Sequence, residues 1–189
     1  MDSLRLMTAE EFAALAEEDE FEPRWTELVS GRIVSLEPPA LEHGAVVLNL
    51  TKAIARYLQQ AQDENGYACF EIGLVVARNP DTVRRPPVSF FVGGQRFAEL
   101  DRHLTETRPA FVVEIASTND RRRAMRERVE SYLKWGVRTV WVADPAEKAI
   151  HVMQSGRPPR LFSGEQSVPG YPVFGNFQLR INELFEMPG

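Results

Sequence analysis

The stretch that decides the fold is "AFVVEIASTNDRRRAMRERVESYLKWGVRTVWVADP", residues 110–145. It begins with an apolar run at 111–115, continues with apolar residues at helical spacing, and ends in a second apolar run. Thr118 or Asn119 is a suitable helix N-cap, and Gly136 is a suitable helix stop. A strand, a helix and a second strand in this order form a crossover unit whose two strands lie parallel in one sheet. The stretch therefore predicts an α/β fold.

The segments on either side of this unit predict hairpins and further helices. Ser30-Gly31 separates two apolar stretches, which is typical of a β-hairpin, and the segment 40–62 carries a long apolar stripe at helical spacing. We expect, in chain order, a helix at 8–18, a hairpin at 25–37, a helix at 40–62, strands at 67–77 and 86–92, a polar loop with a little helix at 93–109, a hairpin strand at 148–154, one or two short strands, and a helix at 181–187. Together they predict one domain, residues 1–189, with a central mixed sheet flanked by helices.

The composition is that of a globular protein and limits its partners. Of the 189 residues, 43% are apolar and 26% are charged. No apolar run approaches the roughly 20 residues that span a bilayer, and the N-terminus lacks the pattern of a secretory signal. Together with the lone Cys69, this predicts a cytoplasmic protein without a membrane partner. Because the net charge is −5, DNA would have to be bound by a local basic patch.

The motifs of several common enzyme classes do not occur in the sequence. There is no HExxH or CxxC pattern for zinc, no GxGxxG or Walker loop for nucleotides, and no GxSxG nucleophile motif. Ser117 is the best-placed serine, but the sequence offers no obvious histidine base for it. These absences argue against structural zinc sites, dinucleotide oxidoreductases, P-loop enzymes and serine hydrolases.

Glu114 is the strongest physical anomaly, because it interrupts an apolar strand at 111–115 that is typical of a strand buried on both faces. An ionised carboxylate there needs a metal, a cation or several hydrogen bonds. Arg128 lies at the edge of the apolar stripe of the following helix and could turn toward Glu114. The alternatives are a strand-end carboxylate that reaches solvent or caps that helix, and a solvated arginine.

Four arginines crowd the first turns of the same helix. Cations at a helix N-terminus oppose the helix dipole, which favours an acidic partner nearby. They form either a solvated face or a patch that contacts the phosphates of a nucleic acid. The candidate nucleic-acid residues are Arg121, Arg122, Arg123 and Arg126.

Several runs resemble the Uma-type family of putative restriction endonucleases. They include "ELVSGRI" (27–33), "PPALEH" (38–43), "VVEIAS" (112–117) and "YLKWGVRTVWVADP" (132–145), and the likeness extends from Thr8 to Phe185. The resemblance implies the PD-(D/E)XK nuclease fold, a restriction-endonuclease-like central mixed sheet flanked by helices. It also implies hydrolysis of DNA phosphodiester bonds with Mg²⁺ as cofactor.

The resemblance assigns catalytic roles residue by residue, with two departures from the pattern. Glu27, His43 and Glu114 match the family's two acids and its histidine, and Glu114 and Glu27 are the implied metal ligands. The family's first-strand aspartate falls on Pro87, and its lysine falls on Arg128. Proline has no side-chain oxygen for a hard cation, and arginine differs from lysine in geometry. The resemblance thus implies an incomplete metal site and impaired catalysis.

Two outcomes remain open for this site. Glu71 or Asp81 could move into the gap, or Glu27 could take a larger share, and cleavage with Mg²⁺ would be retained. Otherwise Glu114 pairs with Arg128, no cofactor is bound, and the protein is a non-catalytic homo-oligomer, such as a dimer, that binds DNA or a protein. A further alternative is an oligomer whose edge strands pair between subunits while the site serves no purpose.

Overall fold

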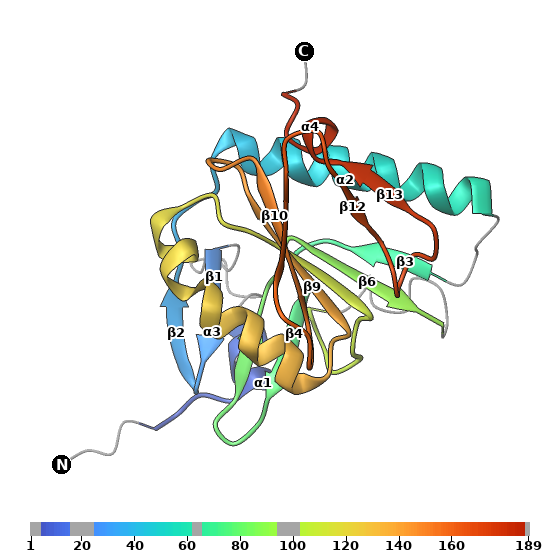
Figure 1. The fold of residues 1–189 in the computed structure, drawn as a ribbon. Coiled ribbons are helices and arrows are strands. Elements are labelled where there is room, and N and C mark those ends of the chain that lie inside the picture. The colour runs from blue at the N-terminus through green and yellow to red at the C-terminus, as the bar shows by residue number, and fades with distance from the viewer. Residues whose placement is uncertain (1–4, 16–24, 62–65, 94–102, 188–189) are drawn as a thin grey trace.

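The computed structural model describes residues 5–15, 25–61, 66–93 and 103–187. Within these ranges, strands form two larger sheets and a small one, and helices cover them (Figure 1). The helices are α1 (Ala9–Leu15), α2 (Leu41–Ala61), α3 (Asn119–Trp135) and α4 (Ile181–Leu184). The predicted helices at both termini, at 40–62 and in the crossover unit are confirmed in position, although residues 16–18 of the first lie outside the described residues. Residues 94–102, which make up most of the expected loop with a little helix at 93–109, also lie outside them.

The crossover unit lies at the centre of a six-stranded sheet. Its two strands are parallel, with Phe111 opposite Thr139 and Ile115 opposite Ala143, as the strand–helix–strand order predicts. The spatial order is β11 (Arg160–Ser163), β10 (Ala149–Gln154), β9 (Thr139–Asp144), β8 (Phe111–Ile115), β6 (Val88–Val92) and β3 (Gly66–Cys69).

A second sheet of five strands was not predicted. The expected single strand at 67–77 is in fact two strands, because the chain turns at Glu71, whose φ is 50°. The first half joins the six-stranded sheet and the second half joins the five-stranded sheet, so a second sheet accompanies the predicted central mixed sheet. The spatial order of the second sheet is β2 (Arg32–Ser35), β1 (Thr26–Val29), β5 (Thr82–Arg84), β4 (Gly73–Ala77) and β7 (Leu104–Thr105).

The predicted hairpin at 25–37 is confirmed as β1 and β2. Ser30 and Gly31 at its turn have φ values of 50° and 73°. Positive φ at both central residues gives the turn the twist that two antiparallel strands require. The C-terminal part forms a third pair, β12 (Ser167–Pro169) and β13 (Gln178–Arg180), which agrees with the predicted short strands.

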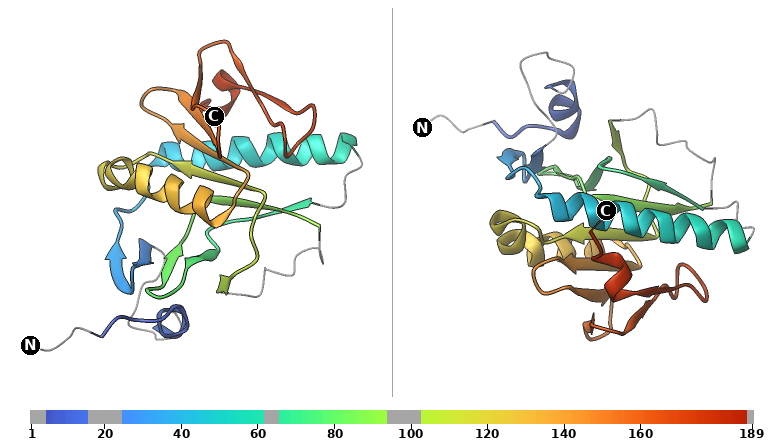
Figure 2. Two further views of the ribbon diagram at one scale, coloured as in Figure 1. Left: turned by 60° about the horizontal axis from the view of Figure 1, so that its bottom comes forward. Right: turned by 90° about the horizontal axis from the view of Figure 1, so that it is seen from above.

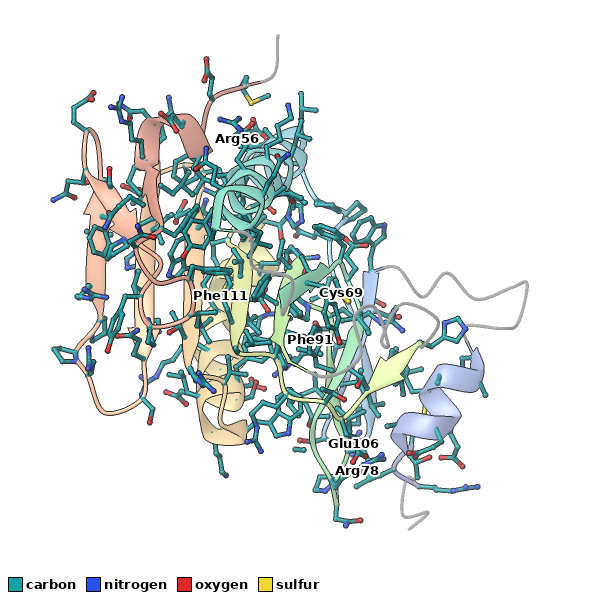
Figure 3. The ribbon with its side chains drawn as sticks, turned by 90° about the vertical axis from the view of Figure 1, so that its right-hand side faces the viewer. Arg56, Cys69, Arg78, Phe91, Glu106 and Phe111 are labelled. Atoms are coloured by element: carbon teal, nitrogen blue, oxygen red, sulfur yellow. The ribbon has the colours of Figure 1, made fainter. Side chains whose placement is uncertain are left out.

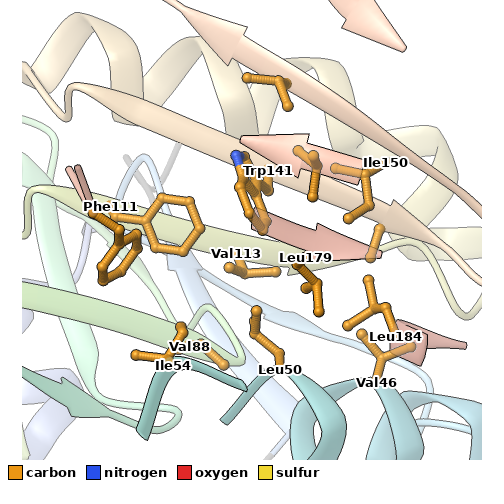
Figure 4. Packing of buried hydrophobic residues seen from close by; sticks show 14 of the residues in the cluster. Val46, Leu50, Ile54, Val88, Phe111, Val113, Trp141, Ile150, Leu179 and Leu184 are labelled. Atoms are coloured by element: carbon orange, nitrogen blue, oxygen red, sulfur yellow. The ribbon is translucent and has the colours of Figure 1, made fainter. Parts of the chain in front are cut away.

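Two apolar cores lie on opposite faces of the six-stranded sheet. On one face, the stripe of α2 with Val46, Leu50 and Ile54 packs against strand residues such as Val113 and Trp141 (Figure 4). On the other face, α3 packs against alternate residues of the same strands. Because both faces are covered, the central strands are apolar throughout, and any charged side chain among them is conspicuous.

Helix α1 lies at the other end of the molecule from the C-terminal segment (Figure 2). An ion network holds it there: Arg78 pairs with Glu10 at 2.7 Å, with Asp81 at 2.7 Å, and with Glu106. Figure 3 shows Arg78 and Glu106 next to each other near α1. No helix among the described residues is long and apolar enough to cross a membrane.

Candidate functional site

A cluster of four charged side chains is buried where the two larger sheets meet α3. Glu27 comes from β1, Arg84 from β5, Glu114 from β8 and Arg128 from α3. Each of these residues is at most 3% exposed. The structure therefore brings together the two predicted carboxylates and the predicted cation, and Glu114 does not reach solvent.

The guanidinium of Arg128 lies between the two carboxylates and binds both. Its Nη1 donates to Glu27 Oε2 at 2.5 Å, and its Nη2 donates to Glu114 Oε1 at 2.7 Å. The Tyr132 hydroxyl, one helical turn further along α3, donates to the same Glu114 oxygen at 2.6 Å. The interpretation of Arg128 as a residue that turns inward from the edge of the helical stripe agrees with this geometry.

Glu27 is also held by β5, a strand that was not predicted from the sequence. Arg84 Nη1 donates to Glu27 Oε2 at 3.1 Å, and the backbone N–H of Arg85 donates to Glu27 Oε1 at 2.7 Å. Arg84 also reaches outward, because its Nη2 donates to Glu127 at 2.6 Å. Two buried carboxylates and two buried guanidiniums thus form a neutral cluster with a link to the surface.

The charges in this cluster stabilise one another's ionised forms. Burial alone would raise the pKa of Glu27, but the charge of Arg128 and its hydrogen bond, with the charge of Arg84, hold that pKa below its usual value. Burial alone would lower the pKa of Arg128, but Glu114 and Glu27 raise it well above its usual value. Burial and the negative charge of Glu114 raise the pKa of Tyr132, so its hydroxyl keeps the proton it donates.

The side chains at this position do not fit a magnesium ion. Arg128 already fills the space between Glu27 and Glu114 with a cation, and Mg²⁺ requires a shell of oxygen ligands. Pro87 immediately precedes β6, and the register of β6 with β8 continues to place it opposite Glu114, where it offers no side-chain oxygen. Nowhere in the described part of the chain do three His, Cys, Asp or Glu side chains gather in a way that could hold a metal.

The two residues considered as replacements for the missing aspartate lie in different places. Asp81 is held at the turn between β4 and β5, where it accepts hydrogen bonds from the backbone of Ala9 and from Arg78. Glu71 is exposed and lines a pocket of about 450 Å³ together with His43 and Pro87. Only Glu71 is therefore near the position that lacks the aspartate.

His43 lies outside the ion cluster and contacts Ser117, the serine for which the sequence offered no obvious histidine base. Its Nδ1 is 3.2 Å from Ser117 Oγ, across 74 residues of sequence, so the fold gives Ser117 a histidine neighbour that was not apparent from the sequence. Burial lowers the pKa of His43, and the charge of Arg121 lowers it further, to about 4. The imidazole is therefore a weak base, which does not suit it to activate a serine.

The free energy of unfolding is expected to fall between pH 6.5 and pH 4 because of His43. The unfolded chain takes up a proton near the ordinary pKa of 6.5, whereas the folded protein takes it up only near 4. In this window the unfolded state binds more protons, so stability decreases as pH falls, by up to about 3 kcal/mol. The pKa of Glu27 is lowered from 4.5 in the folded protein, so Glu27 reduces the free energy of unfolding further only when the pH falls below 4.5.

Urea denaturation at a series of pH values measures this slope. His43→Gln should reduce it between pH 6.5 and pH 4, the values that bracket the titration of this imidazole. An unchanged slope in the variant would show that His43 is protonated equally well in the folded and unfolded states.

The four arginines predicted to contact nucleic acid do not form one free surface. Arg121 is buried, at 3% exposure. Arg122 makes a two-pronged pair with Asp144 at 3.0 and 3.1 Å, and Arg126 pairs with Glu130 at 2.8 Å. Arg123 is exposed on the same helix. Two of the four arginines at the start of α3 are thus paired within the protein, and a third is buried.

Two residues of this site, one cluster arginine and the tyrosine bound to Glu114, were not predicted from the sequence. Arg84 lies in a short strand between two prolines and a turn, and nothing in its basic neighbourhood distinguishes a buried arginine from a surface one. Tyr132 was recognised as part of the apolar stripe of α3, but its hydroxyl was not considered. A tyrosine on a buried stripe needs a hydrogen-bond partner, and this requirement was the available signal.

Comparisons with known proteins agree with this architecture. A family model, Uma2, described as "Putative restriction endonuclease", matches residues 9–182. The chain is also similar to a crystal structure of a putative nuclease belonging to DUF820 from Anabaena variabilis. The TM-score is 0.76, and the identity is 21% over 95% of this chain and 97% of that chain. No curated protein matches. The predicted fold class and the predicted family resemblance are both confirmed.

Proposed function

We propose, since the chain belongs to the Uma2 family of putative restriction endonucleases, that it binds DNA without cleaving it. The family suggests DNA as the partner. The single observation that supports the loss of cleavage is the position of Arg128, which binds both carboxylates that would otherwise be free for a metal. In this account the guanidinium supplies the positive charge that the two buried acids require, and no hydrolytic step takes place.

Two further observations favour this proposal over retained cleavage. Pro87 cannot act as a ligand at the position opposite Glu114, and Asp81 is held by other partners. Arg128 remains charged at any pH at which the protein is folded, because its pKa is raised well above the usual value. A guanidinium in this position cannot leave by losing a proton, so a metal would have to displace it from two charge-assisted hydrogen bonds.

The test is a cleavage assay combined with a binding assay on the same preparation. We expect no cleavage of duplex or single-stranded DNA with Mg²⁺ or Mn²⁺. We also expect DNA binding at about 50 mM salt that weakens as salt increases, because phosphate contacts release counterions. Cleavage that disappears in Glu114→Gln would overturn the loss of catalysis, and absence of binding at low salt would overturn the choice of DNA.

The exposed arginine on α3 offers a matched pair of variants for the binding assay. Arg123→Gln removes a charge that faces solvent, whereas Arg138→Gln removes an equal charge from the exposed surface beyond the end of the same helix. If the start of α3 contacts DNA, the first variant should reduce both the affinity and the salt dependence more than the second.

A further inference from the structure

The long helices α2 and α3 begin next to each other. His43, in the first turn of α2, contacts Ser117, which lies two residues before α3. The backbone N–H of Glu37, shortly before α2, donates to Asp120 in the first turn of α3 at 2.7 Å. Each helix N-terminus carries a partial positive charge, so this junction is electropositive before any side chain is counted.

A buried arginine adds a full positive charge to the junction. Arg121 is 3% exposed, and its Nε and Nη1 atoms are buried without a hydrogen-bond partner. Asp120 is the nearest acid along the helix, but its oxygens accept from the Thr118 hydroxyl, from the backbone of Arg121 and from the backbone of Glu37. Two donors of the Arg121 guanidinium thus lack a hydrogen-bond acceptor, which is rare in folded proteins, although its charge helps to lower the pKa of Asp120.

Arg121 follows Ser117, the residue that contacts His43, by four positions, and its charge contributes to the lowered pKa of that imidazole. If the Ser117 hydroxyl donates to Nδ1, the neutral ring carries its proton on Nε2 and can donate from there. His43 also lines the pocket of about 450 Å³ that contains Glu71 and Pro87, so the His43 side of the junction can be reached from solvent, whereas Arg121 lies buried behind it. The N-cap residue Thr118 does not cap α3 with its side chain.

We propose that the junction of the two helix starts is a phosphate site, in which Arg121 and His43 donate hydrogen bonds to a phosphate group of a nucleic acid. A phosphate has enough oxygens to accept from a guanidinium and an imidazole together, and helix starts favour anions. The inference rests on the proposed function only in naming nucleic acid as the source of the phosphate. The alternative is that water molecules accept hydrogen bonds from the unpaired donors of Arg121.

The test measures His43 and Arg121 separately. Inorganic phosphate is titrated into the full-length protein while the ring resonances of His43 are followed by NMR. Bound phosphate should raise the pKa of His43 from about 4, because a negative charge near the ring favours the imidazolium. Arg121→Gln should weaken phosphate binding by about tenfold or more. Arg138→Gln removes the same charge from an exposed position beyond the end of α3 and should leave binding unchanged.

An oligonucleotide then identifies the source of the phosphate. If a single-stranded oligonucleotide displaces inorganic phosphate and depends on Arg121, the proposal stands as stated. If inorganic phosphate binds and the oligonucleotide does not compete, the assignment to nucleic acid is wrong. If phosphate moves neither resonance of His43, or if both arginine variants behave alike, water occupies the junction and the proposal is overturned. None of these results depends on cleavage, so the non-cleaving account succeeds or fails separately.

Discussion

Replacing Arg128 with methionine is expected to destabilise the folded protein by about 3–5 kcal/mol. Methionine has a similar length, so the main loss is the charge that lies between two buried carboxylates. Glu27 would keep Arg84 and the backbone N–H of Arg85, whereas Glu114 would keep only the Tyr132 hydroxyl. The uncompensated charge at Glu114 is therefore the dominant cost. A buried ion pair is weak evidence of net stability, but losing one partner is costly.

Urea denaturation of the wild type and the variant at neutral pH measures the effect. Arg126→Met is the matched control, because Arg126 is on the same helix and pairs with Glu130 at the surface, where ion pairs contribute little to stability. The double variant Glu114→Gln/Arg128→Met should recover part of the loss, because it removes the unpaired charge together with its partner. A single variant that is as stable as the control would show that Glu114 does not depend on Arg128, which would contradict this account of the ion cluster.

The crossover unit was predictable because each of its elements carries an unambiguous local pattern. The apolar runs around Glu114 are long enough for buried strands, and Gly136 ends α3 with the positive φ, 103°, that glycine adopts at helix ends. The buried carboxylate was predictable for a related reason, since a charge inside an apolar run must find a partner. Arg128 was the candidate because it lies at the edge of the apolar stripe of the next helix, and it is the partner.

The remainder of the site depends on contacts that no local pattern encodes. Arg84 reaches Glu27 only because β1 and β5 are neighbours in a sheet that the turn at Glu71 separates from the first one. The contact between His43 and Ser117 likewise joins two helix starts that are far apart in sequence. Strand order across two sheets is a property of the whole chain, so neither contact could be derived from spacing alone.

Restoring the aspartate should create a metal site that the wild type lacks. Pro87→Asp places a carboxylate on the strand position opposite Glu114, where neighbouring side chains lie about 5 Å apart. Glu114 Oε2 is buried without a hydrogen-bond partner and is available as a second ligand. Arg128→Lys shortens the cation and removes its two-pronged grip, which frees the carboxylates for a metal. The double variant Pro87→Asp/Arg128→Lys is therefore expected to bind Mn²⁺ or Mg²⁺.

Metal binding to the double variant should appear as stabilisation and as new activity. A ligand that binds only the folded state adds about 2.7 kcal/mol at a concentration of 100 times its Kd, so Mn²⁺ should raise the melting temperature of the double variant but not that of the wild type. Nicking of plasmid DNA should appear with the same metal. Pro87→Asn/Arg128→Lys is the control, because asparagine matches aspartate in shape but has no negative charge. If Mn²⁺ raises the melting temperature of this control as much as that of the aspartate variant, the residue opposite Glu114 is not a metal ligand. If the wild type is itself stabilised by Mn²⁺, Arg128 does not exclude the metal, because the carboxylates can then release their guanidinium when a divalent cation competes for them.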